Sequence, residues 1–147
     1  EIAMEELITY LTQGDYEKVA DILSKYNDIR DWLMRIAYET ESLYIYSFTQ
    51  YMYKQTGNES WIEWAIDLLL NPLCVIEGAY SVALFHAREL LRKHRNVENL
   101  ERILFFSDIP EKLVSNGEAI SIAREILRID PNNKAATLKV DTNEWEH

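Results

Sequence analysis

The side chains that most often take part in chemistry are few in this sequence of 147 residues: three histidines, one cysteine and an excess of carboxylates. His86 and His94 lie eight residues apart, roughly two turns along one predicted helix. A zinc site of the His-Glu-x-x-His kind needs two ligands and a base on one face, and here only the two histidines roughly align. We therefore expect a partly buried or solvated pair, and no metal or other cofactor.

Catalytic motifs are also missing. A four-carboxylate metal bundle uses Glu-x-x-His pairs, but Ala83 and Leu91 stand three residues before the internal histidines. The isolated glycines form neither a dinucleotide-binding loop nor a P-loop, and no Gly-x-Ser-x-Gly elbow is present. Cys74 has no Lys, Arg or His close to it in the sequence that would activate its thiol, so we expect a small buried side chain. The sequence predicts no catalytic residue and no enzyme.

The charge balance excludes a general nucleic-acid binder. The chain carries 25 acidic and 15 basic side chains, a formal net charge of −10, whereas phosphate contacts need Lys and Arg in excess. Hydrophobic residues make up 48% of the chain, which is too many for a disordered protein. We therefore expect a folded acidic domain with a single core.

The sequence also favours a cytoplasmic protein. A single cysteine cannot form an internal disulfide, which argues against a disulfide-built secreted scaffold. The first residues lack the basic and apolar segments of a signal peptide. Acidic residues and an Asn-Pro pair interrupt the most apolar stretch, 61–85, so we expect buried core there and no membrane span. Residue 1 is Glu, so we expect natural residues to precede it.

The spacing of apolar residues predicts an all-α fold. The four glycines and three prolines fall almost entirely between segments in which apolar residues recur every three or four positions, and no long segment alternates as a strand does. We predict stacked antiparallel hairpins, as in an α-solenoid, with about seven to nine helices. The expected helices cover residues 2–13, 16–26, 28–55 with a break near 39–42, 60–70, 75–95, 97–105, a short turn from 107–110, 118–129 and 131–139.

Several helix ends are predicted from single residues. Ser60 and Glu63 have the spacing of a capping box, and Pro110 suits the first position of a short helix. Gly78 falls inside an expected helix, where we expect another helix to cross closely. The Asp130-Pro131 pair is expected to cap and begin the last helix. We predict one helical domain over residues 1–140 and a loose tail over 141–147.

Two segments resemble tetratricopeptide repeats. Residues 14–20, Gly-Asp-Tyr-Glu-Lys-Val-Ala, look like the turn into the second helix of such a unit. Residues 119–133 look like the end of one unit and the junction to the next, with small Ala119 and Ala123 where paired helices approach and Asp-Pro-Asn-Asn at 130–133. The two segments cover about a seventh of the chain. The resemblance implies a groove that binds a protein, without naming the partner.

The negative charge is concentrated in the first part of the sequence. Residues 1–86 contain 14 acids and 5 bases, whereas residues 87–147 contain 11 acids and 10 bases. Residues 55–86 contain no base, and Glu59, Glu63 and Asp67 follow one another at every fourth position of a predicted helix. We name these three residues the acidic ridge. Like charges at this spacing repel, so either a partner, solvent or bases from neighbouring helices must compensate them.

Tyrosines form the second concentration, with five of the nine between residues 38 and 53. Tyr46 and Tyr53 fall at the margin of the core face, near Glu39 and Gln50, where a ring can pack and still offer its hydroxyl. Ordinary packing at the boundary of the core explains them equally well. If the helices of this margin and of the ridge are adjacent, one acidic and aromatic surface results. The predicted partner-binding residues are Glu39, Tyr46, Gln50, Tyr53, Glu59, Glu63 and Asp67.

An acidic surface with aromatic anchors suits a basic protein partner. In its gross features the chain is similar to immunity proteins of bacterial contact-dependent or polymorphic toxin systems. That resemblance implies direct binding of a basic toxin domain, for example a nuclease, in its active site or substrate groove. The alternative is a tetratricopeptide-like adaptor or regulator that holds a partner peptide or helix, and a third possibility is an enzyme or metal protein. Neither nucleic acid nor membrane is an expected partner, and the oligomeric state stays open.

Overall fold

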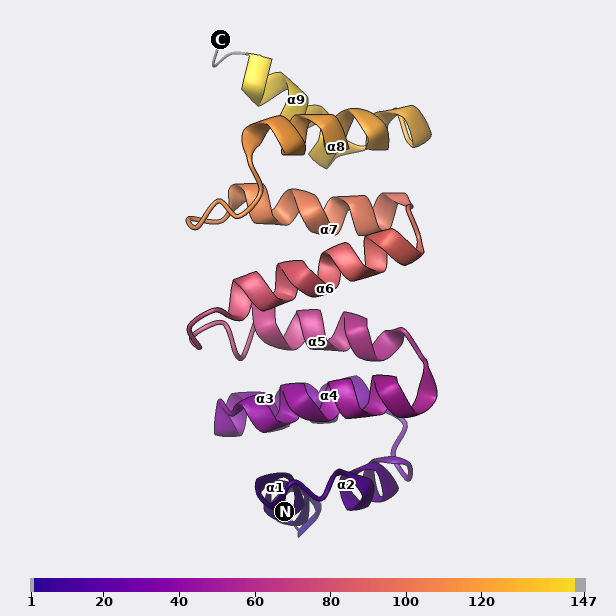
Figure 1. Ribbon diagram of the computed structural model, residues 1–147, viewed down its shortest axis with the longest axis vertical. Helices are drawn as coiled ribbons and strands as arrows, with labels where there is room; N and C mark the ends of the chain where they lie inside the picture. The colour runs from indigo at the N-terminus through magenta and orange to yellow at the C-terminus, as the bar shows by residue number, and fades with distance from the viewer. Residues whose placement is uncertain (1, 145–147) are drawn as a thin grey trace. The chain divides into compact units, whose positions relative to one another are not determined.

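The structure is a computed structural model that describes residues 2–144. This part of the chain forms nine α-helices and no strand (Figure 1). Consecutive helices pack against each other, among them α1 and α2, α4 and α5, and α7, α8 and α9, which confirms the predicted all-α fold. The helices are α1 (Ile2–Gln13), α2 (Tyr16–Leu23), α3 (Ile29–Thr40), α4 (Leu43–Thr56), α5 (Ser60–Leu70), α6 (Ala79–Lys93), α7 (Val97–Asp108), α8 (Asn116–Ile129) and α9 (Lys134–Glu144).

The chain divides into two compact units, residues 1–83 and residues 84–147, with the boundary inside α6. We call them unit 1 and unit 2. The single domain over residues 1–140 stays a prediction. Helix α9 continues to Glu144, so its last four residues occupy the start of the segment that was expected to be a loose tail, and residues 145–147 lie outside the described part.

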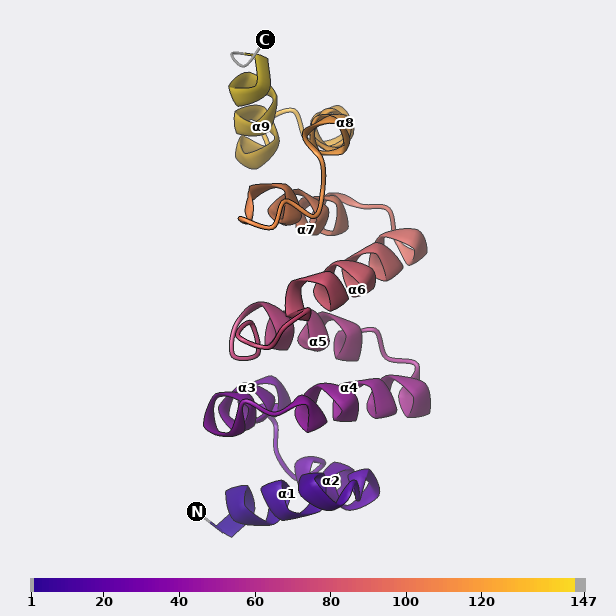
Figure 2. The same ribbon diagram turned by 60° about the vertical axis from the view of Figure 1, so that its left-hand side comes forward.

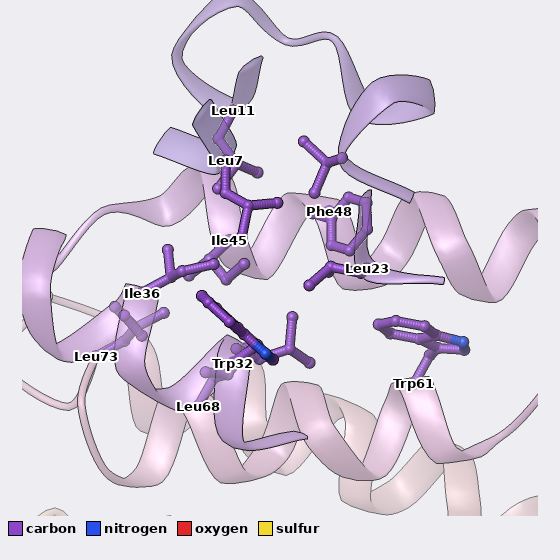
Figure 3. Packing of buried hydrophobic residues seen from close by; sticks show 13 residues of the cluster. Leu7, Leu11, Leu23, Trp32, Ile36, Ile45, Phe48, Trp61, Leu68 and Leu73 are labelled. Carbon is purple, nitrogen blue, oxygen red and sulfur yellow. The ribbon is translucent and has the colours of Figure 1, made fainter. Parts of the chain in front are cut away.

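Unit 1 is built around one cluster of buried apolar side chains (Figure 3). Phe48 of α4 is fully buried in it, and the rings of Tyr16 and Trp61 meet it edge-on with centroids 5.7 and 5.8 Å away. Within this unit α3 and α4 lie between the α1–α2 hairpin and α5 (Figures 1 and 2). The residues of the cluster are Leu7, Leu11, Val19, Leu23, Trp32, Leu33, Ile36, Ala37, Ile45, Phe48, Trp61, Leu68 and Leu73.

The predicted break near residues 39–42 is confirmed. Helix α3 ends at Thr40, Glu41 adopts a left-handed conformation with φ 48°, and Ser42 caps α4 by accepting a hydrogen bond from the Tyr44 amide. Helix α4 ends at Thr56, and the residue after it, Gly57, is also left-handed, with φ 68°. A left-handed residue lets the chain reverse after the last helical turn, so these two positions set the directions of α4 and α5.

Alanine substitutions at two glycines are expected to have opposite effects on stability. Gly57→Ala should lower the free energy of unfolding by about 1 kcal/mol, because alanine is strained at φ 68°. Gly117→Ala should leave stability unchanged or raise it by up to about 1 kcal/mol, since this residue is in the first turn of α8 and an added Cβ meets only Ser115 Oγ at 4.0 Å. Urea denaturation of both variants measures the difference, and equal effects would contradict the assigned backbone conformations.

Two successive pairs of helices, α6–α7 and α8–α9, have a similar layout in the sequence. Helix α6 begins at residue 79 and α8 at residue 116, 37 residues later, and α7 and α9 begin at residues 97 and 134, again 37 apart. Residues 87–92 of α6 read Ala-Arg-Glu-Leu-Leu-Arg and residues 123–128 of α8 read Ala-Arg-Glu-Ile-Leu-Arg. This correspondence between α6 and α8 was not among the features predicted from the sequence.

Two predicted features of the α5–α6 region are wrong. The capping box at Ser60 and Glu63 does not form, because Ser60 already lies in the first turn and its amide donates to the side chain of Asn58 at 2.9 Å. Gly78 precedes α6 with φ 84°, and a Cβ added there would meet nothing within 4 Å. The glycine is therefore needed for its backbone conformation and not for a close helix crossing.

Two predicted helix starts in unit 2 are also wrong. No short helix begins at Pro110: Ile109 is extended at the end of α7, as the residue before a proline prefers. Asp130 and Pro131 form a turn in which the Asp130 carboxylate accepts a hydrogen bond from the Asn132 amide. Helix α9 begins only at Lys134, and Asn133 caps it through the Ala136 amide at 2.9 Å.

Two findings concern the segment 61–85, the exposure of Cys74 and the character of the helices. Cys74 is exposed in the turn between α5 and α6, not buried, because the preceding Leu73 occupies the core position. Among the helices of residues 2–144, none has both the length and the apolar character needed to cross a membrane.

Candidate functional site

The boundary between the units coincides with the change in charge along the sequence. Unit 1 contains 14 acidic and 5 basic residues, a net charge of −9, and unit 2 contains 11 acidic and 10 basic residues, a net charge of −1. Almost the whole excess of negative charge therefore belongs to one compact unit. A field of one sign over one body attracts partners of the opposite sign.

The acidic ridge lies on α5 and its N-terminal end, with all three side chains half-buried. The carboxylate of Asp67 accepts a hydrogen bond from Arg30 Nε of α3 at 3.1 Å. A base from a neighbouring helix therefore compensates the negative charge of Asp67. Glu59 and Glu63 also interact with other groups of the chain. The ridge is thus a folded part of the surface of unit 1 whose carboxylates still reach solvent.

The predicted residues of α4 are half-buried as well. Tyr46 and Tyr53 pack against the core cluster of unit 1, so packing at the boundary of the core accounts for their rings. The Gln50 amide donates a hydrogen bond to the hydroxyl of Thr49 at 3.2 Å. A contact of these three residues with a partner stays a prediction.

Helix packing brings the three helices that carry the predicted site together. Helix α5 contacts both α3 and α4, as the short link of residues 56–58 favours. Glu39 lies on α3 and is exposed. The seven predicted residues thus belong to one packed group of helices, and their union in a single binding surface stays a prediction.

A hollow between α1 and α3 adds an aromatic residue that the sequence analysis did not select. Its volume is about 460 Å³, and Met4, Arg35, Tyr38 and Glu39 line it. Tyr38 is 62% exposed, far more than the half-buried Tyr46 and Tyr53. The Arg35 guanidinium lies 4.6 Å from the ring centroid of Trp32, which fixes one wall. The concentration of tyrosines pointed to this region, but periodicity alone could not tell which ring is exposed.

The two histidines differ in their surroundings. His86 is buried, with Nδ1 3.0 Å from a carboxylate oxygen of Glu89, and His94 is exposed. Their positions fit the partly buried or solvated pair that the sequence predicts. In residues 2–144, no group of three or more His, Cys, Asp or Glu side chains is arranged to hold a metal ion.

A groove of about 320 Å³ runs between α6 and α8 in unit 2, and we name it the arginine groove. Arg88 donates two hydrogen bonds to Glu118 at 2.7 and 3.1 Å, and Arg95 donates two to Glu125 at 2.6 and 2.8 Å. Each pair joins residues 30 positions apart, so α6 and α8 run in the same direction (Figure 1). The groove is lined by Arg88, Leu91, Arg92, Arg95, Glu118, Ser121 and Ile122.

These two fork-shaped pairs shift the titration of their members. Hydrogen bonds from Arg88 lower the pKa of Glu118, and hydrogen bonds from Arg95 lower the pKa of Glu125. The same bonds raise the pKa of both arginines. The charged form of each pair is therefore favoured in the folded chain, and both pairs are ionised at neutral pH.

The Arg95–Glu125 pair predicts a pH-dependent stability. A carboxylate whose pKa is lowered by folding stabilises the chain above its unfolded pKa, about 4.3, and this stabilisation is lost as the pH falls through the folded value. The side chains are 59% and 24% exposed, so solvent screens the pair and Glu125→Gln should cost only about 0.5–1 kcal/mol at pH 7. Urea denaturation of the wild-type chain and of Glu125→Gln at pH 7 and pH 3 should show that the difference between their free energies of unfolding is smaller at pH 3. A difference of equal size at both pH values would contradict the stabilising role of the Arg95–Glu125 pair.

Comparison with known proteins supplies no family for this chain. No protein-family model matches it, and neither the search of curated proteins nor that of solved structures finds a match. Any function must therefore be argued from the surfaces described above.

Proposed function

We propose that the chain is a non-enzymatic protein-binding domain whose acidic unit 1 recognises a basic partner protein. The observation that carries this proposal is the concentration of charge, because 83 residues hold a net charge of −9 while the rest of the chain is nearly neutral. Charge of one sign over one unit accelerates association with a basic surface and disfavours acidic partners.

The proposed contact surface combines the acidic ridge with exposed residues of α3. Glu59, Glu63 and Asp67 supply carboxylates that face the bases of the partner. Tyr38, 62% exposed beside Glu39, supplies an aromatic anchor of the kind that dominates binding energy at interfaces. Tyr46, Gln50 and Tyr53 of the neighbouring helix α4 are half-buried, and we propose them as secondary contacts.

The partner class that fits this surface best is a basic toxin domain such as a nuclease, and in this proposal the chain is an immunity protein. A nuclease needs a basic groove for phosphates, and a rigid acidic surface can occupy that groove in place of nucleic acid. Neutralisation then requires only tight binding and no chemistry by the chain itself.

A genetic and biochemical pair of experiments tests the immunity function. The gene next to the one for this chain should encode a protein with a basic toxic domain, and co-expression of the chain should abolish its toxicity. The purified full chain should bind that domain with a Kd that rises steeply with salt. A neighbouring protein that remains toxic, or binding that does not respond to salt, would overturn the proposal.

A second function is favoured by the repeated helix pairs α6–α7 and α8–α9. The 37-residue spacing of their helices and the near-identity of residues 87–92 and 123–128 support a helical-repeat adaptor of the tetratricopeptide-like kind, which holds a partner peptide in a groove between helices. This function and the binding of a basic partner use different units, so one does not exclude the other.

A further inference from the structure

We propose that the arginine groove of unit 2 binds an acidic peptide segment of a partner protein and that Arg92 receives a carboxylate of that segment. This inference rests on the second function proposed above, the helical-repeat adaptor, and gives it a site and a ligand class. It does not depend on the binding of a basic partner by unit 1.

The groove carries positive charge in a chain that is otherwise acidic. Residues 79–95 and 116–129, which form its two walls, contain six Lys and Arg against three Glu. Two of the carboxylates, those of Glu118 and Glu125, are already engaged by arginines from the opposite wall. The charge that remains available in the groove is therefore positive, and it complements an acidic ligand.

Arg92 is the group available for a ligand. It is exposed, it lines the groove, and within residues 2–144 it forms no hydrogen bond or ion pair. Arg88 lies one turn before it on α6, Arg95 follows the end of α6 at Lys93, and the bonds of both arginines to α8 hold the two walls at a fixed separation. The planar guanidinium of Arg92 presents a fork of donors that matches the two oxygens of a carboxylate.

The size of the groove limits the length of the segment. Glu118 and Glu125, the acidic members of the two pairs, are seven residues apart on α8, about 10 Å along the helix axis, and an extended peptide advances about 3.3 Å per residue. About three residues therefore lie between the two arginine–glutamate pairs. The segment that fits is short, extended and acidic.

The floor of the groove adds a requirement for an apolar side chain. Leu91 and Ile122 line it and are 8% and 5% exposed. Phe85, which is 61% exposed, lies one turn before Arg88 on the same face of α6. A segment in which Asp or Glu alternates with Leu-like residues would place its carboxylate on Arg92 and its apolar side chain on this floor.

Titration of the full chain with a defined peptide, followed by NMR of its methyl groups and arginine side chains, tests the proposal. The probe is acetyl-Asp-Leu-Asp-Leu-Asp-amide, and NMR detects even millimolar binding and locates it. We expect shifts of the Leu91 and Ile122 methyl signals and of Arg92 Nε–H that weaken as salt is added. The matching peptide with Asn in place of Asp should leave these signals unchanged. Shifts elsewhere, no shifts, or equal shifts with both peptides would overturn the proposal.

A matched pair of variants checks the role of Arg92. Arg92→Gln should raise the Kd of the Asp peptide about tenfold, because one charge-assisted contact is lost. Arg128→Gln should change it less than about twofold, since Arg128 holds the corresponding place in α8, is exposed and lies outside the groove lining. Both are surface changes and should leave the circular dichroism spectrum unchanged. Equal losses in the two variants would overturn a specific role for Arg92.

Two further measurements separate other occupants of the groove. If inorganic phosphate or a thymidine hexanucleotide binds more tightly than the Asp peptide and shifts the same NMR signals, the ligand of the groove is a phosphate and not an acidic peptide. If the wild-type chain sediments as an oligomer and Arg92→Gln dissociates it, the occupant of the groove is the acidic unit 1 of a second copy. Glu59→Lys/Glu63→Lys, which alters unit 1 only, should bind the Asp peptide as the wild type does, so failure of this proposal and failure of basic-partner binding give different results.

Discussion

Replacing Phe48 with alanine should lower the free energy of unfolding of unit 1 by about 3–5 kcal/mol. Phe48 is fully buried at the centre of the core cluster, where edge-on contacts with Tyr16 and Trp61 and a stacked contact with Tyr51 surround its ring. Removal of the ring forfeits its transfer from water, leaves a cavity in a packed interior and removes these aromatic contacts. This is the largest effect on stability that we expect from one substitution.

Tryptophan fluorescence during urea denaturation measures this effect, because three of the four tryptophans, Trp32, Trp61 and Trp64, belong to unit 1. The control is Leu43→Ala, which removes a large apolar side chain of α4 from a position that is 53% exposed and should change stability by less than about 0.5 kcal/mol. A loss below about 1 kcal/mol for Phe48→Ala, or similar losses for the two variants, would show that the cluster is not the core of unit 1.

Reversal of the acidic ridge should produce the largest effect on binding. The triple variant Glu59→Lys, Glu63→Lys and Asp67→Lys should raise the Kd for the basic partner by about a hundredfold or more, because attraction at three positions becomes repulsion. These positions are half-buried and not core residues, so the chain should stay helical by circular dichroism. An unchanged Kd in a folded variant would mean that the ridge is only a solvated face.

Two control variants separate loss of binding from other effects of the reversal. Glu101→Lys, Glu111→Lys and Asp141→Lys change the net charge by the same amount but place the new charges on unit 2, and they should weaken binding less than about tenfold. Glu59→Lys/Glu63→Lys keeps the Arg30–Asp67 ion pair and should still weaken binding more than the unit 2 variant. Equal weakening by the triple variants would assign the effect to net charge instead of to the ridge.

Apolar periodicity was sufficient to predict most helices. The limits of α1 and α5 are those expected, because each helix buries one face and a glycine or an Asn-Pro pair follows its end. The break after Thr40 was predicted because the apolar residues of 29–36 and those of 44–52 lie on different faces of one continuous helix. The left-handed conformation of Glu41 could not be predicted, since nothing about a glutamate favours it.

Errors occurred where one residue could serve two local structures. Pro110 could begin a helix or end one, and the buried, extended Ile109 before it decides for the end. Cys74 is a residue type that is commonly buried, yet the adjacent Leu73 fills the core. In both cases tertiary packing selects between alternatives that the local sequence leaves equally open.

The candidate surfaces also differ in whether the sequence could predict them. The concentration of acidic residues is a property of sequence and maps directly onto unit 1. The exposure of Tyr38 and the arginine groove depend on which helices become neighbours. Contacts between residues 30 positions apart, such as Arg88 and Glu118, leave no pattern in a local window. The repeated six-residue motif of α6 and α8 is the signal that could have indicated two equivalent helices.

The association rate of the full chain with its basic partner, measured by stopped-flow at salt concentrations from about 20 to 500 mM, tests most directly whether unit 1 is an electrostatic binding surface. We predict that the rate for the wild-type chain falls by at least about tenfold over this range. The rate for the ridge-reversed variant should be slower at low salt and nearly independent of salt. Equal rates and equal salt dependence for the two chains would contradict the account.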